Sequence, residues 1–311
     1  MSNQYITTAA PVSKRNPISA NALLVHLYIS QWSGKKIDGR AANTLTNAVN
    51  AKANSASVVK HLLGADCAEL NRIHNLGTTA RTWFVSATMP WMDRGTRLLP
   101  VRRFVEVEQE LLQRQQLYYE AVDELMDVYS DRVAQSRVAL GAMFDETDCP
   151  TPDHVRAAFS MRFRFAPVPE SGDFRVDVSN EQMAALMQHY ATEATDLVQA
   201  GLKASSDVAV EALRTLSDRL DALQEYDTNP EAGTTRKPIL RDSVVEHFID
   251  AVDMLEANNV AENPSVSQMA THLRQAARSL DASALRSSVN VRDEAATTVN
   301  QVLATLPSLD F

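Results

Sequence analysis

One long stretch of the chain limits its fold more than any other. Between Pro100 and Phe144, apolar residues recur at seven-residue intervals in neighbouring rows. The first row is Val105, Leu112, Tyr119, Met126, Val133 and Leu140; beside it lie Phe104, Leu111, Tyr118 and Leu125, and a third row is Val101, Val122 and Tyr129. This apolar face is wider than the seam of a two-stranded coiled coil. We therefore predict one long helix that can contact more than one neighbour.

A second long helix is predicted from about Asn180 to Tyr226. Its apolar residues step by three, four and seven: Val198, Leu202, Ala209, Leu213, Leu216, Leu220 and Leu223. Pro100 suits the first turn of the first helix, and Ser179 or Asn180 suits the N-cap of the second. Helices of similar length most simply fold back on each other, so we expect a long antiparallel helical hairpin, a coiled-coil-like bundle.

The β signal lies between the two long helices. Met161–Phe165 and Phe174–Val178 both alternate apolar and polar residues, and a Pro/Gly loop separates them. This pattern predicts a β-hairpin. The apolar run from Ala22 to Trp32 suits either a buried strand or a short helix, and periodicity alone does not decide between them. A lone hairpin is marginally stable in water, and Leu23–Ser30 within this run is the available third strand. The predicted fold class is mainly α, with a small β-hairpin or three-stranded sheet.

The remaining sequence divides the chain into further regions. We predict a flexible arm over 1–20, a basic region of helices and strand over 21–98, the helix–hairpin–helix over 99–227, a linker over 228–238 and a C-terminal helical bundle over 239–311. Helical spacing also occurs, weakly over 38–53, at Ser57–Leu63 and Asp66–Ala87, at Thr151–Phe159, and at about 239–257, 265–280 and 284–306. Pro90–Gly95 is expected to be a loop.

Motifs for catalysis are missing from the sequence. The chain has 9 glycines and contains neither glycine-rich phosphate loop, and its 7 histidines lack metal-ligand spacing. The acidic run Asp145–Asp148 is expected to be a solvated turn, with a divalent-cation site as the alternative. Its charge would raise the pKa of Cys149, which disfavours a reactive thiolate. We predict no enzyme activity, no catalytic residue, no metal and no cofactor.

The ends of the chain and its apolar runs also bear on location. The first residues lack the pattern of a signal peptide, and no apolar run is long enough for a membrane helix. The two cysteines favour a reducing compartment over a disulfide scaffold. We therefore expect a cytoplasmic protein that does not contact a membrane.

Charge is distributed unevenly along the chain. Met1–Arg103 contains 13 Lys/Arg and 4 Asp/Glu, a net charge of +9, whereas the remaining residues carry 17 against 35, a net charge of −18. A basic end on an acidic body could contact nucleic acid, or it could pair with the acidic body of another copy.

The candidate contacts for either partner lie in this basic part. They are Lys35, Lys36, Arg40, Arg81, Arg94, Arg97, Arg102 and Arg103, together with Trp32 and Trp91. Aromatic rings beside cations are typical of single-strand binding, because bases stack on them. The other interpretation places the tryptophans in the core, and we favour it.

Three segments together resemble a family found in tailed bacteriophages and integrative mobile elements, described only as a domain of unknown function. They are Ile29–Asp38, Trp91 with its neighbours from Pro90 to Pro100, and Phe165–Val176. The resemblance implies a phage or mobile-element setting, in the cytoplasm of an infected or host bacterium or in the virion. It also implies an ATPase or another phage protein as a partner, and it assigns no catalytic residue.

Two hypotheses about function follow. The first is a non-enzymatic helical interaction or assembly protein of phage or mobile-element origin that works as a homo-oligomer. The second is a nucleic-acid-binding protein of phage replication or recombination that uses the basic N-terminal region to contact DNA.

Overall fold

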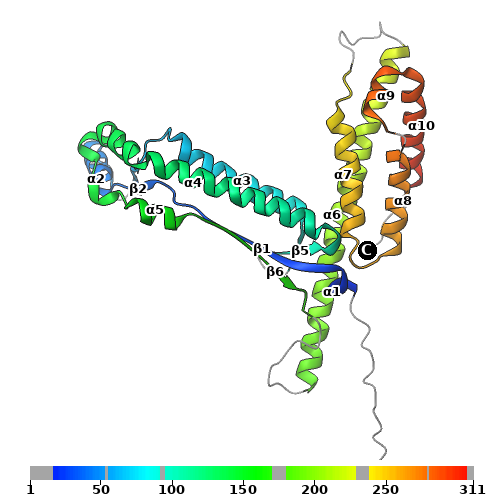
Figure 1. Cartoon of the computed structure of the whole chain (residues 1–311), viewed down its shortest axis with the longest axis horizontal. Helices are drawn as coiled ribbons and strands as arrows, with labels where there is room; N and C mark the ends of the chain where they lie inside the picture. The colour runs from blue at the N-terminus through cyan, green and yellow to red at the C-terminus, as the bar shows by residue number, and fades with distance from the viewer. Residues whose placement is uncertain are drawn as a thin grey trace, which may run out of the picture. The chain divides into compact units, whose positions relative to one another are not determined.

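The computed structural model describes residues 17–52, 55–91, 95–169, 180–228, 238–278 and 280–306. Over these residues the protein is mainly α-helical with a small antiparallel sheet (Figure 1). The predicted fold class is confirmed.

The chain forms two compact units, and each collects separate segments. The α4 unit consists of Val25–Thr88 and Phe104–Phe165. The bundle unit consists of Met1–Leu24, Met89–Arg103 and Ala166–Phe311. The regions predicted from the sequence run continuously along the chain, whereas these units interleave.

The α4 unit is built around two helices that lie side by side, α3 (Ala68–Ala87) and α4 (Phe104–Leu140) (Figure 1). Its other helices and turns are α2 (Gly39–Ala48), η2 (Gly141–Met143), η3 (Glu146–Asp148) and α5 (Pro152–Ala158). A two-stranded antiparallel ribbon joins β2 (Lys35–Ile37) to β3 (Val59–His61).

The bundle unit is built around α6 (Asn180–Thr228), which packs against α7 (Asp242–Asn258), α8 (Pro264–Arg278) and α10 (Val289–Thr305) (Figure 1). It also contains α1 (Pro17–Asn21), β4 (Met89–Pro90), β5 (Thr96–Pro100), η1 (Val101–Arg103) and α9 (Ala282–Ser287). α1 is tied to the bundle by Asn21, whose Nδ2 donates to the Val260 carbonyl at 3.2 Å.

The larger sheet has the strand order β4-β5-β1-β6. β1 (Ala22–Ser30) confirms the strand predicted over Leu23–Ser30, and β6 (Ser160–Pro167) confirms the first predicted hairpin strand. The two are neighbours in the sheet, as expected of a third strand beside the hairpin. The second hairpin strand, Phe174–Val178, lies outside the described residues.

Each unit has its own apolar core, and helix rows supply most of it. In the α4 unit, the buried side chains come mainly from α3 and α4 and include Ile73, Tyr118, Val122, Leu125 and Tyr129. In the bundle unit, they come from α6, α7, α8 and α10 and include Leu213, Leu216, Phe248, Leu273 and Val299. Burial of apolar area at about 25 cal/mol per Å² is the main stabilising contribution to such cores.

Two glycines permit close approaches that a larger residue would prevent. A Cβ at Gly77 of α3 would lie 2.4 Å from Nε2 of Gln31, which donates to the Ile73 carbonyl at 2.8 Å. A Cβ at Gly201 of α6 would lie 2.6 Å from Cε of Met89. The first glycine lets the end of β1 contact α3, and the second lets β4 contact α6.

The pairing of the two long helices differs from the expected hairpin. Both helices form, but α4 packs on α3 and α6 packs on α7, each within its own unit. Apolar rows specify that a helix face must be covered, but they do not specify which segment covers it. The expected antiparallel hairpin is therefore replaced by two separate helix pairings.

Three local predictions are wrong. Residues 59–61 of the predicted helical segment Ser57–Leu63 form β3, because they pair with β2 in antiparallel register. Pro100 ends β5 and does not begin the long helix. The helix predicted over 284–306 is two helices, because Ser288 has extended backbone and caps α10 through its Oγ, which accepts from the Val291 N–H.

Candidate functional site

The candidate contacts of the basic part divide between the two units. Trp32, Lys35, Lys36, Arg40 and Arg81 belong to the α4 unit, whereas Trp91, Arg97, Arg102 and Arg103 belong to the bundle unit. Arg94 lies outside the described residues. Of the set, Lys35, Lys36 and Arg40 come together, on β2 and the first turn of α2.

The β2–β3 ribbon has two chemically different faces. Lys36 pairs with Lys60 in the register, while Ile37 pairs with Val59. Because side chains alternate along a strand, these two pairs face opposite sides. Lys60 is 6% exposed, so the side of the ribbon that carries it faces the interior of the unit. On the opposite side, Ile37 is 68% exposed and Val59 is 46% exposed. The inner face is therefore ionic, and the outer face presents the aliphatic Ile37 and Val59 beside Lys35.

Lys60 anchors this end of the α4 unit. Its Nζ forms an ion pair with Asp148, lies 3.5 Å from Oδ2 of Asp38 and donates to the Met143 carbonyl at 3.0 Å. Lys36 pairs with the same Asp148 at 2.8 Å. A buried amine with three acceptors is fully satisfied, so Lys60 is a structural group that joins β3, the cap of α2 and the end of α4.

The acidic run Asp145–Asp148 is thus only partly the solvated turn that we expected. Hydrogen bonds from Lys36 and Lys60 hold the pKa of Asp148 below its usual range. The Asp145 carboxylate accepts from Thr147, which lowers the pKa of Asp145. Asp148 is paired with lysines, and within the described residues no group of three His, Cys, Asp or Glu side chains could hold a metal ion.

A cavity of about 900 Å³ lies beside this network, between α2 and the segment that follows α4. Its charged lining residues are three cations and three carboxylates: Lys36, Arg40 and Lys60, and Asp38, Asp145 and Asp148. Opposite charges in equal number give the cavity no electrostatic preference for a phosphate or another anion.

The basic and acidic parts of the sequence pair within the α4 unit. Arg72 of α3 pairs with Glu124 of α4, and Arg132 of α4 holds Glu69 of α3 at 2.8 Å. The unit contains 13 Lys/Arg and 15 Asp/Glu, a net charge of −2, and the bundle unit contains 17 against 24, a net charge of −7. The cations of the basic segment that fall in the α4 unit and the carboxylates of α4 and the turns after it therefore nearly cancel in number.

The aromatic candidates are less accessible than single-strand binding requires. Trp91 is 6% exposed in the core of the bundle unit, so its ring could stack on a base only after local unfolding. Trp32 is half-buried, with its ring 6.3 Å from that of Tyr129. In the bundle unit, burial lowers the pKa of the half-buried Arg97. The core interpretation holds for Trp91.

α4 retains an exposed apolar row. In one row, Leu111, Tyr118 and Leu125 are fully buried against the rest of the α4 unit. In the neighbouring row, Val105 is 60% exposed, Leu112 is 50% exposed and Tyr119 is 37% exposed. We call these three residues the α4 row. The sequence contains the row, but only the packing reveals which row stays uncovered.

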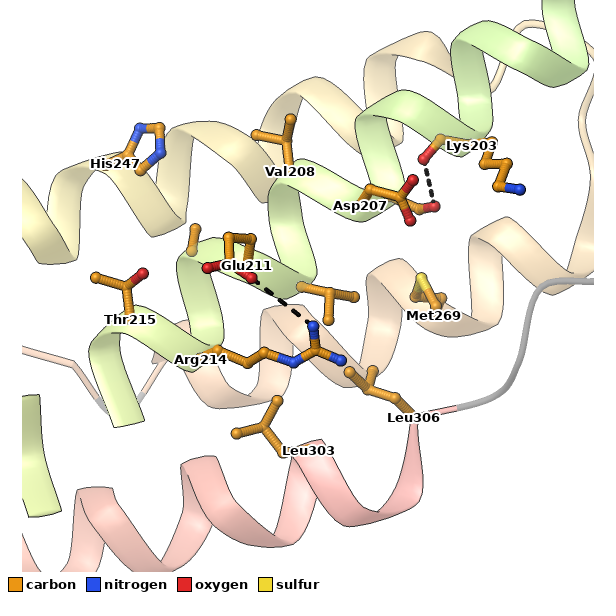
Figure 2. Close-up of a pocket in the computed structure, with 13 residues that line it drawn as sticks. Lys203, Asp207, Val208, Glu211, Arg214, Thr215, His247, Met269, Leu303 and Leu306 are labelled. Carbon is orange, nitrogen blue, oxygen red and sulfur yellow. Dashed lines mark hydrogen bonds and ion pairs between the residues drawn. The ribbon is translucent and has the colours of Figure 1, made fainter. Parts of the chain in front are cut away.

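The bundle unit carries an open groove of about 1140 Å³ (Figure 2). Charged side chains of α6 line one wall: Lys203, Asp207, Glu211 and Arg214. Met269 of α8, the half-buried Leu303 of α10 and the half-buried Leu306 that follows α10 provide apolar surface, and His247 comes from α7. Arg214 and Glu211 lie 3.7 Å apart. The sequence did not single out this groove, because its lining comes from four separate helices.

The two cysteines have features of structural residues. Cys67 is buried and Cys149 is half-buried, and burial raises the pKa of both thiols. The neighbouring Asp148 raises the pKa of Cys149 further, in the direction expected from the sequence. A thiol with a raised pKa is a poor nucleophile at neutral pH.

Comparison of the chain with protein-family models, with curated proteins and with solved structures finds no match in any of the three. The resemblance to a phage and mobile-element family therefore stays a prediction. Within the described residues, no helix is both long enough and apolar enough to cross a membrane.

Proposed function

We propose that this chain is a non-enzymatic helical interaction or assembly protein that works as an oligomer. The observation that carries the proposal is the α4 row. Val105, Leu112 and Tyr119 are spaced by seven residues and remain solvent-exposed, whereas Leu111, Tyr118 and Leu125 of the neighbouring row are fully buried.

A linear apolar row on a long helix favours contact with another helix. Exposed aliphatic side chains scattered singly are ordinary, but a row at seven-residue spacing matches the geometry by which helices pack along their length. Burying a half-exposed Leu or Val recovers part of the roughly 1.5–3 kcal/mol that full burial provides. A partner that covers the α4 row would gain this free energy.

Nucleic-acid binding is the alternative proposal, and the exposed Lys35 and Arg40 support it. Against it, Lys36 is already paired with Asp148, and Trp91 is buried. The exposed side chains beside Lys35 are the aliphatic Ile37 and Val59, which offer no ring for base stacking. A filter-binding titration tests this alternative: DNA affinity should fall steeply with salt if phosphates are contacted.

The biological setting in this proposal comes from the resemblance alone. It suggests a protein that acts in an infected or host bacterial cell, or in the virion, with an ATPase or another phage protein as a further partner. These suggestions rest on three short sequence segments.

The size of the protein in solution tests the proposal. Light scattering should give a mass above the 34.3 kDa of one chain at both low and high salt, because an apolar contact is not screened. Leu112→Glu places a charge in the α4 row and should shift the protein to the monomer.

Val138→Glu is the matched control, because Val138 is an 84% exposed aliphatic residue of the same helix outside the α4 row. It should leave the mass unchanged, and circular dichroism should show equal helix content in both variants. A wild-type protein that is monomeric at every concentration and salt would overturn the proposal.

A further inference from the structure

We infer that the α4 row pairs with the same row of a second copy, in an antiparallel contact centred on Leu112. The inference rests on the proposed function, in which the chain is an oligomer, and it adds the partner, the surface and the direction. The contact lies wholly on the α4 unit.

The spacing of the row suits a two-fold contact. Val105 and Tyr119 each lie seven residues from Leu112, on opposite sides of it. When two such helices pack antiparallel about Leu112, Val105 of each copy meets Tyr119 of the other. The same patch then serves both copies, which is the rule for a two-fold interface.

The limits of the exposed row also fit a short, symmetric contact. Further along the same row, Met126 and Val133 are half-buried against the core of the α4 unit. The uncovered part therefore spans the fifteen residues from Val105 to Tyr119, an axial length of about 21 Å. At one end, the Tyr119 hydroxyl contacts the carbonyl of Met161 in β6, so the row runs beside that strand.

Three half-buried aromatic rings lie in the same unit as the row. Phe104 of α4 packs edge-on against Phe165 of β6 at 5.0 Å, and Phe163 lies 5.8 Å from Phe165. Phe104 directly precedes Val105 in the sequence, so this cluster is near the first residue of the row.

The flanks of the row favour another copy of this acidic chain. On one flank of the row, Gln109, Gln113 and Gln116 carry no charge. On the other flank lies Glu108, which an antiparallel pair centred on Leu112 places level with the neutral Gln116 of the second copy. Two chains with a net charge of −9 repel each other in general, and repulsion is smallest where neutral residues meet. Beyond Tyr119, α4 becomes acidic through Glu120, Asp123, Glu124, Asp127 and Asp131, which disfavours a longer contact between copies.

The charge order along α4 selects the antiparallel direction. Glu106, Glu108 and Glu110 lie in the first two turns of the helix. A parallel pair would hold these glutamates of both copies at one level, where like charges repel. In an antiparallel pair, the glutamates of one copy lie opposite residues 114–118 of the other copy, which carry no acidic side chain. The two helix dipoles then point in opposite directions, which is the favourable arrangement for neighbouring helices.

Site-specific cross-linking of the full chain tests this contact. Cys149→Ser removes the half-buried thiol, and Cys67 stays buried. In that background, Leu112→Cys should cross-link to itself with a short bismaleimide about 100-fold faster than Val138→Cys. A cysteine within a complex experiences a millimolar effective concentration, whereas collisions occur at micromolar concentration.

Cross-linking of two further variants, alone and mixed, shows whether the two α4 helices run parallel or antiparallel. Val105→Cys and Tyr119→Cys should each cross-link poorly alone and efficiently when mixed, because antiparallel pairing brings these two positions together. Efficient cross-linking of Val105→Cys to itself would mean a parallel pair and would overturn the inference.

Light scattering of the same samples separates the two proposals. An oligomer in which none of the α4-row positions cross-links above the Val138→Cys control leaves the proposed function standing and overturns the inferred contact. A monomer overturns both.

Discussion

The two long helices differ in how their exposed apolar residues are arranged. α6 has Val198, Leu202, Leu213, Leu216 and Leu220 at 1% exposure or less, and its exposed Leu186 and Val208 lie far apart along the helix. α4 has buried rows of the same quality, but it leaves Val105, Leu112 and Tyr119 exposed. Both helices were predicted from the same kind of spacing, so periodicity alone does not decide how much of a helix is covered.

The difference follows from the neighbours that each helix has within its unit. α7, α8 and α10 surround α6, and each contributes an apolar face. α4 packs on α3 and α5, and α3 also contacts it through charges such as Arg72 with Glu124. A helix with three helical neighbours has its apolar face enclosed, whereas one covered mainly from one side retains a free row.

The largest expected effect on stability comes from comparing a core leucine of α6 with a leucine of the α4 row. Leu213→Ala should lower the free energy of unfolding of the bundle unit by about 3 kcal/mol, because it leaves a cavity where Leu213 is fully buried. Leu112→Ala should cost roughly 0.5 kcal/mol or less in the dilute monomer, as at other exposed sites. Urea unfolding followed by circular dichroism at low protein concentration measures both.

Equal losses from the two alanine variants would break the comparison, because they would mean that the α4 row is covered within the monomer. The low concentration matters, since association through the row would add stability that depends on protein concentration.

A somewhat smaller effect is expected from the ionic anchor of the α4 unit. Lys60→Met should lower its free energy of unfolding by about 2–3 kcal/mol, because Asp148 and Asp38 lose a buried cation. Lys35→Met changes an exposed lysine on the same ribbon and should have little effect. Fluorescence of Trp32 and Trp83 in a Trp91→Phe background reports on the α4 unit alone.

The smallest expected effect is an acid sensitivity of the α4 unit. Arg132 lowers the pKa of Glu69, hydrogen bonds from Lys36 and Lys60 lower that of Asp148, and the Ala41 N–H lowers that of Asp38. A carboxyl with a lowered pKa in the folded state stabilises it above the unfolded pKa, near 4. That contribution is lost as pH falls through the folded-state pKa.

The urea midpoint of the α4 unit should therefore decrease between about pH 5 and pH 3. Asp148→Asn removes one of the titrating groups and should make the decrease shallower. Tryptophan fluorescence in the Trp91→Phe background measures the urea midpoint of both proteins. A midpoint that decreases as steeply with falling pH in Asp148→Asn as in the parent would contradict the role of Asp148.

Much of the local structure could be predicted from the sequence, because helix periodicity is a local property. The long helices, the strand at Leu23–Ser30 and the alternating strand at Met161–Phe165 all formed where their patterns indicated. The failure at Ser57–Leu63 has the same origin. A short apolar run fits either structure, and only the pairing of Val59 with Ile37 made it a strand.

The candidate site could be predicted less well than the fold. Lys35, Lys36 and Arg40 do lie together, but Lys36 is paired with Asp148, which is more than a hundred positions away in the sequence. The burial of Trp91 likewise depends on α6, a helix that begins about ninety residues later. No local pattern encodes such contacts.

The sequence by itself determined which segments are helices, where apolar rows lie on them and how unevenly charge is distributed along the chain. These properties follow from residue type and spacing alone. The tertiary structure decided which rows are covered and which charges are neutralised, because burial and ion pairing depend on what other segments bring into contact. The α4 row is uncovered because the segments packed against α4 cover the neighbouring row of Leu111, Tyr118 and Leu125 instead, and Lys60 is a structural group because folding places Asp148 and Asp38 around it.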